Sequence, residues 1–281
     1  MLSTLVTAAQ LGSNLERWAV VDCRFDLKNE SAGLDAYLAA HIPGAVYAHL
    51  GHDLSGPMTG TNGRHPLPSI DAMTSTFSRW GIANDTQVVC YDANGMFAAR
   101  LWWMLRYLGH DAVAVLDGGF DAWTRTGGAV RGGCETRTPT QFVPRVRPGM
   151  LTTLDEMASG LAQSARLVDA RAPERFEGRT EPLDKAAGHI PGAVNRCFME
   201  NVHADGTMKP PAELRATYED LLGGTPPDQT VMYCGSGVTA CQNLLALEHA
   251  GIRGVRLYAG SWSEWCADAT RPVETGQARG E

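Results

Sequence analysis

Short apolar runs rich in β-branched residues alternate along the chain with longer segments of helical character. AVVDCR at 19–24, VVCYDANG at 88–95 and VMYCGSG at 231–237 are such runs, and the last two end in polar and glycine-rich residues. Strands that are apolar on both faces are typical of sheets covered by helices on both sides. The pattern therefore predicts an α/β protein with parallel sheets flanked by helices.

The chain also contains an internal repeat. The hexapeptide HIPGAV occurs at residues 41–46 and again at 189–194, and each copy follows an apolar run that contains an aspartate. Further matches keep their order, with Asp92 of the first half corresponding to Cys234 of the second. Repetition of whole strand and helix patterns over this period predicts two homologous halves.

The domain boundaries follow from the repeat. We expect an N-terminal domain at 1–125 and a C-terminal domain at 150–281. Residues 126–149 are rich in Gly, Pro, Thr and Arg and have no steady period, which indicates an extended linker along the surface.

Composition and charge restrict the partners. The net charge is −7, only three residues are lysine, and no basic stripe is present, so a nucleic acid is not expected as a partner. No segment approaches the roughly 18 apolar residues of a membrane span, and the N-terminus has neither a basic region nor a long apolar core. We expect a soluble cytoplasmic protein that binds no membrane.

The seven cysteines do not form a recognisable framework. Their odd number and the absence of C-x-x-C indicate reduced thiols, and the cysteines do not have the spacing of a zinc ribbon. We expect no metal and no other cofactor. Cys23, Cys90 and Cys241 are interpreted as core residues.

Cys234 has the setting of a nucleophile. It follows an apolar strand and precedes a turn with Gly235 and Gly237, after which a helix begins. Glycines let backbone N–H groups point at the sulfur as an anion nest, which favours thiolate and would stabilise a persulfide. A buried structural cysteine is the alternative, but the strand–turn–helix setting favours catalysis. Asp92 cannot be a sulfur nucleophile, so we expect a silent first domain and one active site in the interdomain cleft.

These motifs together resemble the tandem-rhodanese sulfurtransferases, and within them the 3-mercaptopyruvate sulfurtransferases. The resemblance covers essentially the whole chain through the paired HIPGA motifs, the Asp-for-Cys replacement, LDGGFDAW, CGSGVTAC and GSWSEW. It implies two rhodanese-like domains. In thiosulfate-using members the loop reads CRKGVT, whereas this chain has CGSGVT, the mercaptopyruvate pattern, with Ser236 in the place of the basic residue.

The resemblance implies a ping-pong reaction. Cys234 takes sulfur from 3-mercaptopyruvate, pyruvate leaves, and the persulfide passes its outer sulfur to a thiol such as thioredoxin or a small thiol, or to cyanide. Ser236 is the expected proton donor to the pyruvate enolate. His41 of the first HIPGA motif is expected to face Ser236 in a relay. The alternative for His41 is a structural role in the HIPG turn, because His189 occupies the same position in the other half.

Arginines are expected to bind the small anionic donor. Arg175 in DARAPERF matches the family position for the substrate carboxylate, but the second family arginine, after EP, is missing here. Arg179 is the candidate substitute, and Lys185 is a weaker one; a solvated surface charge is the alternative for all three. The loop GRHPLP could also bring Arg64 and His65 to the cleft. Backbone contacts to the donor are expected from Gly235, Gly237, Val238 and Thr239.

Three other interpretations compete with this one. A cysteine phosphatase needs C-x5-R, and Ala240 stands where that arginine would be. A thiosulfate sulfurtransferase that releases sulfite differs only in its donor. A non-enzymatic persulfide-carrier module would accept sulfur from a partner but turn over small donors poorly.

Overall fold

The computed structural model describes residues 1–93 and 95–277. The chain divides into two compact units. The first consists of Met1–Gly56, Pro68–Arg147 and Val202–Met208, and the second of Pro57–Leu67, Pro148–Asn201 and Lys209–Glu281. The units therefore differ from the boundaries expected from sequence, because two short segments group with the other half of the chain.

The first unit is built on five parallel strands in the order β1-β5-β4-β2-β3. The strands are β1 (Leu5–Val6), β2 (Ala19–Asp22), β3 (Val46–Tyr47), β4 (Val88–Tyr91) and β5 (Val113–Leu116). The helices are α1 (Ala8–Gly12), α2 (Ala32–Ala39), α3 (Ile70–Arg79), α4 (Ala98–Tyr107) and α5 (Gly119–Arg125). Every residue of β2, β4 and β5 is buried, as expected for strands covered on both faces.

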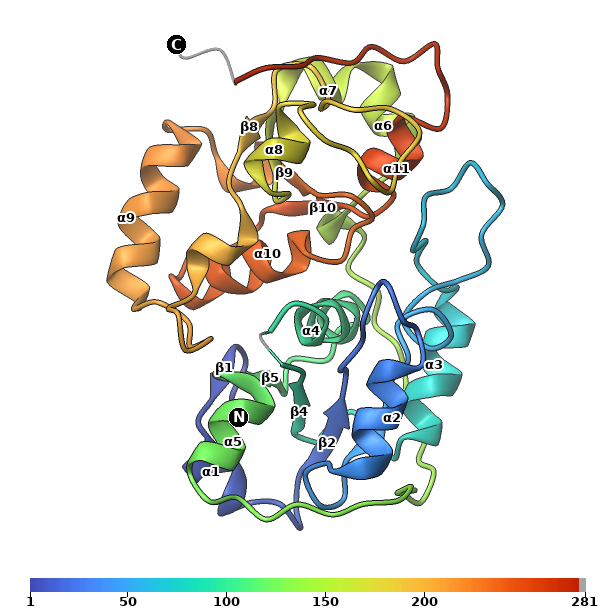
Figure 1. Cartoon of the computed structure of the whole chain (residues 1–281), viewed down its shortest axis with the longest axis vertical. Helices are drawn as coiled ribbons and strands as arrows, with labels where there is room; N and C mark the ends of the chain where they lie inside the picture. Colours follow the sequence, from blue (N-terminus) through green and yellow to red (C-terminus); the bar gives the residue numbers. More distant parts are fainter. Residues whose placement is uncertain (94, 278–281) are drawn as a thin grey trace. The chain divides into compact units, whose positions relative to one another are not determined.

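The second unit repeats this topology, with five parallel strands in the order β6-β10-β9-β7-β8 (Figure 1). The strands are β6 (Leu151–Thr152), β7 (Arg166–Asp169), β8 (Val194–Asn195), β9 (Thr230–Tyr233) and β10 (Arg256–Tyr258). The helices are α6 (Leu154–Glu156), a π turn (Met157–Leu161), α7 (Ala162–Ser164), α8 (Pro173–Phe176), α9 (Pro211–Leu222), α10 (Ala240–His249) and α11 (Ser261–Trp265). The equivalent strand orders confirm the predicted pair of homologous α/β units.

Each unit has its own apolar core. In the first, Val20 and Val89 of the sheet pack in one cluster with Leu11 of α1 and Trp123 of α5, and α1 and α5 lie together in Figure 1. In the second unit, Val231 and Trp265 belong to the corresponding cluster. A buried tryptophan removes a large apolar area from water, so the repeated tryptophan is a main anchor of each core.

The linker predicted at 126–149 lies along the first unit over most of its length. The N–H groups of Thr140 and Arg145 donate to the carbonyls of Ser78 and Leu108 at 2.9 and 2.8 Å. These bonds satisfy the backbone of an otherwise irregular segment, and they explain why residues up to Arg147 group with the first unit.

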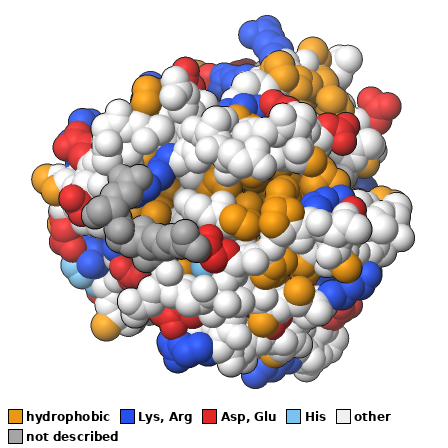
Figure 2. Space-filling model, turned by 90° about the horizontal axis from the view of Figure 1, so that it is seen from above, with side chains coloured by type: hydrophobic (Ala, Val, Ile, Leu, Met, Phe, Trp, Pro, Cys, Tyr) orange, Lys and Arg blue, Asp and Glu red, His pale blue; other side chains and the backbone are white. Residues whose placement is uncertain are grey.

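Charged side chains of both signs share the surface. On the face drawn in Figure 2, Lys and Arg side chains are interspersed with Asp and Glu side chains around a central group of apolar ones. Within the described residues, no helix has the length and apolar character needed to cross a membrane.

Candidate active site

Cys234 lies directly after β9 and ahead of α10, in the second unit. Its N–H donates to Ser261 Oγ at 3.1 Å, and its carbonyl accepts the N–H of Trp262 at 3.0 Å. Ser261 has a positive φ of 56°, which is uncommon for a side-chain-bearing residue. Ser261, at the start of α11, therefore holds the backbone of Cys234 while its own backbone is strained, and such strain is typical of functional sites.

Gly237 supplies a hydrogen bond to the sulfur. Its N–H donates to Cys234 Sγ at 3.1 Å. Its φ of 74° favours glycine, and a Cβ at this position would lie 2.2 Å from the carbonyl oxygen of Ala259. An N–H donor at this distance stabilises negative charge on the sulfur, whether the group is a thiolate or a persulfide.

Ser236 is hydrogen-bonded to a histidine. Its Oγ lies 2.8 Å from His65 Nδ1, and both residues belong to the second unit. Ser236 is 6% exposed, so its hydroxyl is held in a largely water-free setting. A hydroxyl bonded to an imidazole is an arrangement that can pass a proton to or from a bound molecule.

His41, the expected partner of Ser236, has a different position. Its ring is fully buried in the first unit and stacks on Tyr37, its Nδ1 lies 2.8 Å from the Tyr37 carbonyl, and its backbone pairs with Arg131. In the second unit, the His189 ring stacks on Phe176, its Nδ1 lies 2.7 Å from the Phe176 carbonyl, and its backbone pairs with Glu274. The repeated arrangement corrects the expectation: the HIPGA histidines hold the turn, and the histidine at Ser236 is His65.

Arg175 lies beside the cysteine loop. Its Nη2 is 2.7 Å from Glu181 Oε1 and 3.0 Å from Asp184 Oδ2, and its side chain is 18% exposed. A Cβ built on Gly235 would lie 3.4 Å from both terminal nitrogens of Arg175. Burial by itself raises the pKa of Glu181. The hydrogen bond from Arg175, the bond from the Leu183 N–H and the charges of Arg175 and Arg171 lower it by more, so the pKa lies below its ordinary value. The carboxylate that positions Arg175 therefore stays ionised at neutral pH.

Arg179, the other expected donor-binding arginine, is a surface residue. Its side chain is 59% exposed and pairs with Glu177 at 2.5 Å and Glu174 at 3.9 Å. These two carboxylates are its ion-pair partners, and no contact joins it to the cysteine loop among the described residues. Arg179 is thus a solvated charge rather than a substitute for the missing arginine.

Val238 and Thr239 contribute through their backbone. Their carbonyls accept the N–H groups of Cys241 and Gln242, each at 3.1 Å, in the first turn of α10. Val238 is 4% exposed. These residues turn the chain from the loop into the helix and so hold the loop in place.

Asp92 fills the corresponding loop of the first unit with its own carboxylate. The carboxylate accepts N–H groups of Gly95, of Phe97 at 2.5 Å and of Ala98 at 2.8 Å. Gly95 has a φ of 81° and bonds to Asp92 as Gly237 bonds to Cys234. In the described part of this loop, these N–H groups are thus already bonded to an anion of the protein itself.

Four of the other cysteines lack the features of a reactive thiol. Burial is the largest cause of a raised pKa at Cys23, Cys90, Cys197 and Cys266. A raised pKa leaves a thiol protonated and inert at neutral pH. Within the described part of the chain, no cluster of His, Cys, Asp and Glu could hold a metal ion.

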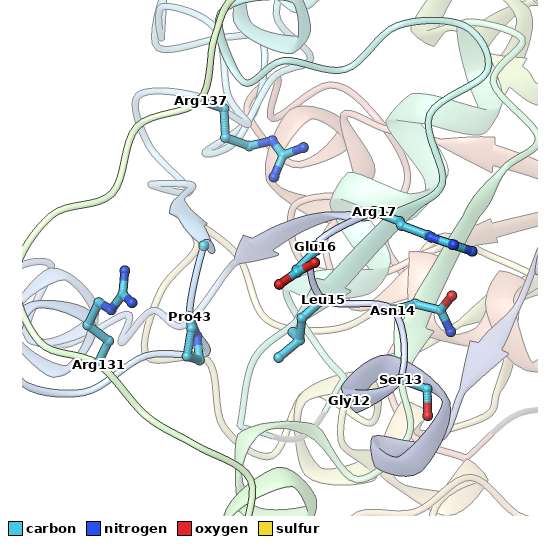
Figure 3. Close-up of a pocket in the computed structure, with 10 residues that line it drawn as sticks. Gly12, Ser13, Asn14, Leu15, Glu16, Arg17, Pro43, Arg131 and Arg137 are labelled. Carbon is cyan, nitrogen blue, oxygen red and sulfur yellow. The ribbon is translucent and has the colours of Figure 1, made fainter.

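A pocket of about 800 Å³ lies on the first unit (Figure 3). Arg131 at its rim pairs with Glu135 at 2.9 Å, and Arg137 donates to the Trp18 carbonyl at 3.4 Å. Burial lowers the pKa of Arg137. No cysteine is among its described lining residues, which all belong to the first unit.

Comparison with known proteins identifies the family. The rhodanese-like domain model matches residues 7–126 and 153–268. The Pseudomonas aeruginosa protein named "Probable 3-mercaptopyruvate sulfurtransferase" is 46% identical over 97% of this chain and 98% of its own. The Mycobacterium tuberculosis protein named "Putative thiosulfate sulfurtransferase SseB" is 40% identical over 98% of each chain.

Solved structures agree with this assignment. The 3-mercaptopyruvate sulfurtransferase from Leishmania major superposes with a TM-score of 0.84 at 31% identity, over 94% of this chain and 74% of that one. Two rhodanese domains with one cysteine loop define a sulfur-transferring enzyme. The chain belongs to the rhodanese family, in the tandem-domain arrangement of the 3-mercaptopyruvate sulfurtransferases.

Proposed function

We propose that this enzyme transfers sulfane sulfur from 3-mercaptopyruvate to a thiol or to cyanide through a persulfide on Cys234, releasing pyruvate. The observation that carries the proposal is the pairing, in one loop, of the Cys234 sulfur bonded to the Gly237 N–H with the Ser236 hydroxyl bonded to His65. A sulfur nucleophile and a proton-transfer pair two residues apart are what this reaction requires.

The first half-reaction forms the persulfide. The Cys234 thiolate attacks the thiol sulfur of the donor, an S–S bond forms, and the C–S bond of the donor breaks. The electron pair of that bond leaves as the enolate of pyruvate. The proton of the donor thiol passes through the Ser236 hydroxyl and His65 to the enolate carbon, so that pyruvate departs without any external oxidant or reductant.

The second half-reaction returns the enzyme to its starting state. A thiolate or cyanide attacks the outer sulfur of the persulfide, and the Cys234 thiolate is the leaving group. The Gly237 N–H, 3.1 Å from the sulfur, stabilises the charge that returns to Cys234. A thiol acceptor leaves as a persulfide and cyanide leaves as thiocyanate.

Thiosulfate is the second candidate donor, and one observation favours it. The CGSGVT loop carries no positive charge, but Arg64 and Arg175 bring two guanidinium groups to Gly235 from outside the loop. These charges are able to attract a dianion as well as a carboxylate. The name of the relative from Mycobacterium tuberculosis points in the same direction.

A comparison of the two donors tests the proposal. With cyanide as acceptor, we expect kcat/KM for 3-mercaptopyruvate to exceed that for thiosulfate by about 10-fold or more. The Ser236–His65 pair accelerates proton transfer to the pyruvate enolate, and the reaction of thiosulfate has no such step. Pyruvate and sulfite release are measured separately, with the Cys234→Ser protein as the blank for uncatalysed reaction. A higher kcat/KM for thiosulfate would reverse the donor assignment.

A further inference from the structure

Arg64 places a second guanidinium group beside the cysteine loop. Its Nε lies 2.6 Å from Asp184 Oδ1 and its Nη2 lies 3.2 Å from Asp184 Oδ2. The same Nη2 would be 2.8 Å from a Cβ built on Gly235, nearer than either nitrogen of Arg175. Asp184 also binds Arg175, so one carboxylate holds both guanidinium groups next to the residue that follows Cys234.

Both arginines retain hydrogen-bond donors directed away from their carboxylate partners. A guanidinium has five N–H donors. In the described structure Arg64 engages Asp184 through Nε and Nη2, and Arg175 engages Glu181 and Asp184 through Nε and Nη2. Neither Nη1 has a protein partner among the described residues, and the two side chains are 25% and 18% exposed. A carboxylate that reaches Gly235 can therefore accept from both.

The charge balance of this cluster depends on Arg64. Three carboxylates take part. Asp169 and Glu181 both pair with Arg171. Glu181 also pairs with Arg175, and Asp184 pairs with both Arg175 and Arg64. The three arginines neutralise them. Without Arg64 the cluster would carry a net negative charge next to Cys234 and would repel an anionic donor.

The local sequence explains why the second cation comes from residue 64. Leu183 follows the EP dipeptide, and it is 44% exposed with no charge to offer. The next residue is the buried acid Asp184, which holds a guanidinium delivered by another segment. The Arg64 backbone N–H bonds to Ser263 Oγ at 3.1 Å, which fixes that segment against α11.

We propose that Arg64 is the second carboxylate-binding residue of the site, acting with Arg175 on the anionic end of the sulfur donor, and that Asp184 is its positioning residue. The proposal rests on the proposed sulfur transfer at Cys234. Residues 64 and 65 then have separate tasks: Arg64 binds the donor carboxylate and His65 serves the Ser236 hydroxyl.

The first test is steady-state kinetics with 3-mercaptopyruvate. Arg64→Gln is expected to raise KM by about 10-fold or more with little change in kcat, because a charged hydrogen bond to the substrate is lost. Arg175→Gln should behave alike, and Arg64→Lys should recover part of the loss, since it keeps the charge without the planar fork. Arg253→Gln removes an exposed charge elsewhere in the second unit and should leave KM unchanged.

A second test does not depend on the sulfur donor. Iodoacetate and iodoacetamide alkylate the same thiol, but only iodoacetate carries a carboxylate. Peptide mass spectrometry resolves Cys234 from the other cysteines and gives its alkylation rate with each reagent. We expect Arg64→Gln to lower the iodoacetate-to-iodoacetamide rate ratio at Cys234 by about 5-fold or more, with the iodoacetamide rate retained.

The outcomes separate the two proposals. If the wild-type protein does not use 3-mercaptopyruvate but the alkylation ratio falls in Arg64→Gln, the donor assignment fails and the carboxylate site stands. An unchanged ratio, including one in which both rates fall together, assigns Arg64 a structural role and overturns the proposal. Failure of both reagents to reach Cys234 in the wild-type protein overturns it as well.

Discussion

Replacement of Cys234 by serine is expected to abolish sulfur transfer from either donor, lowering kcat/KM by about 10⁴-fold or more. The serine hydroxyl remains protonated at neutral pH, and an oxygen at this position cannot form a persulfide. The substitution is nearly isosteric, and the backbone bonds of residue 234 to Ser261 and Trp262 do not involve its side chain. The variant should therefore fold and unfold like the parent protein.

The matched control for this variant is Cys134→Ser. Cys134 is exposed and lies in the first unit, so its replacement should leave kcat/KM unchanged. Thiocyanate formation with both donors measures the activity, and a thermal melt verifies the fold of each variant. Turnover in Cys234→Ser above the rate without enzyme would remove Cys234 from the mechanism.

Loss of the Ser236–His65 pair is expected to have the second largest effect, and the effect should depend on the donor. Ser236→Ala and His65→Gln should each lower kcat with 3-mercaptopyruvate by about 10²- to 10³-fold, the usual contribution of a positioned proton donor. With thiosulfate the loss should be much smaller. Sulfite leaves as a stable anion, whereas the pyruvate enolate needs a proton at carbon.

The double variant shows whether the two side chains act as a unit. Because Ser236 Oγ and His65 Nδ1 share one hydrogen bond of 2.8 Å, Ser236→Ala/His65→Gln should be no slower than the worse single variant. His203→Gln, which changes an exposed histidine, is the control and should be fully active. Equal losses with both donors, or additive losses in the double variant, would contradict a proton relay.

The fold was predictable from sequence because its signals are local and repeated. Two HIPGAV motifs and buried runs such as Val88–Tyr91 specify equivalent strands, and the two sheets have equivalent strand orders. The strand–turn–helix around Cys234 was predictable for the same reason, since its glycines encode the loop. Gly237, with its positive φ and its N–H on the sulfur, shows how directly that short sequence determines the geometry.

The partners of this loop were not predictable in the same way. The bond from His65 to Ser236 spans 171 residues of sequence, and that from Arg64 to Asp184 spans 120. His41 lies in a conspicuous motif, but the motif recurs because it holds a turn in both units. The GRHPLP segment contains both Arg64 and His65, and these two residues group with the second unit although they stand in the first half of the chain, so local sequence patterns could not identify their partners.

The most direct test of the central claim is the mass of the protein after treatment with 3-mercaptopyruvate in the absence of an acceptor. We expect an increase of about 32 Da, the mass of one sulfur atom, confined to the peptide that contains Cys234 and lost on addition of cyanide. Cys134 and the other buried cysteines should remain unmodified. No added sulfur, or sulfur on a different cysteine, would contradict transfer through a Cys234 persulfide.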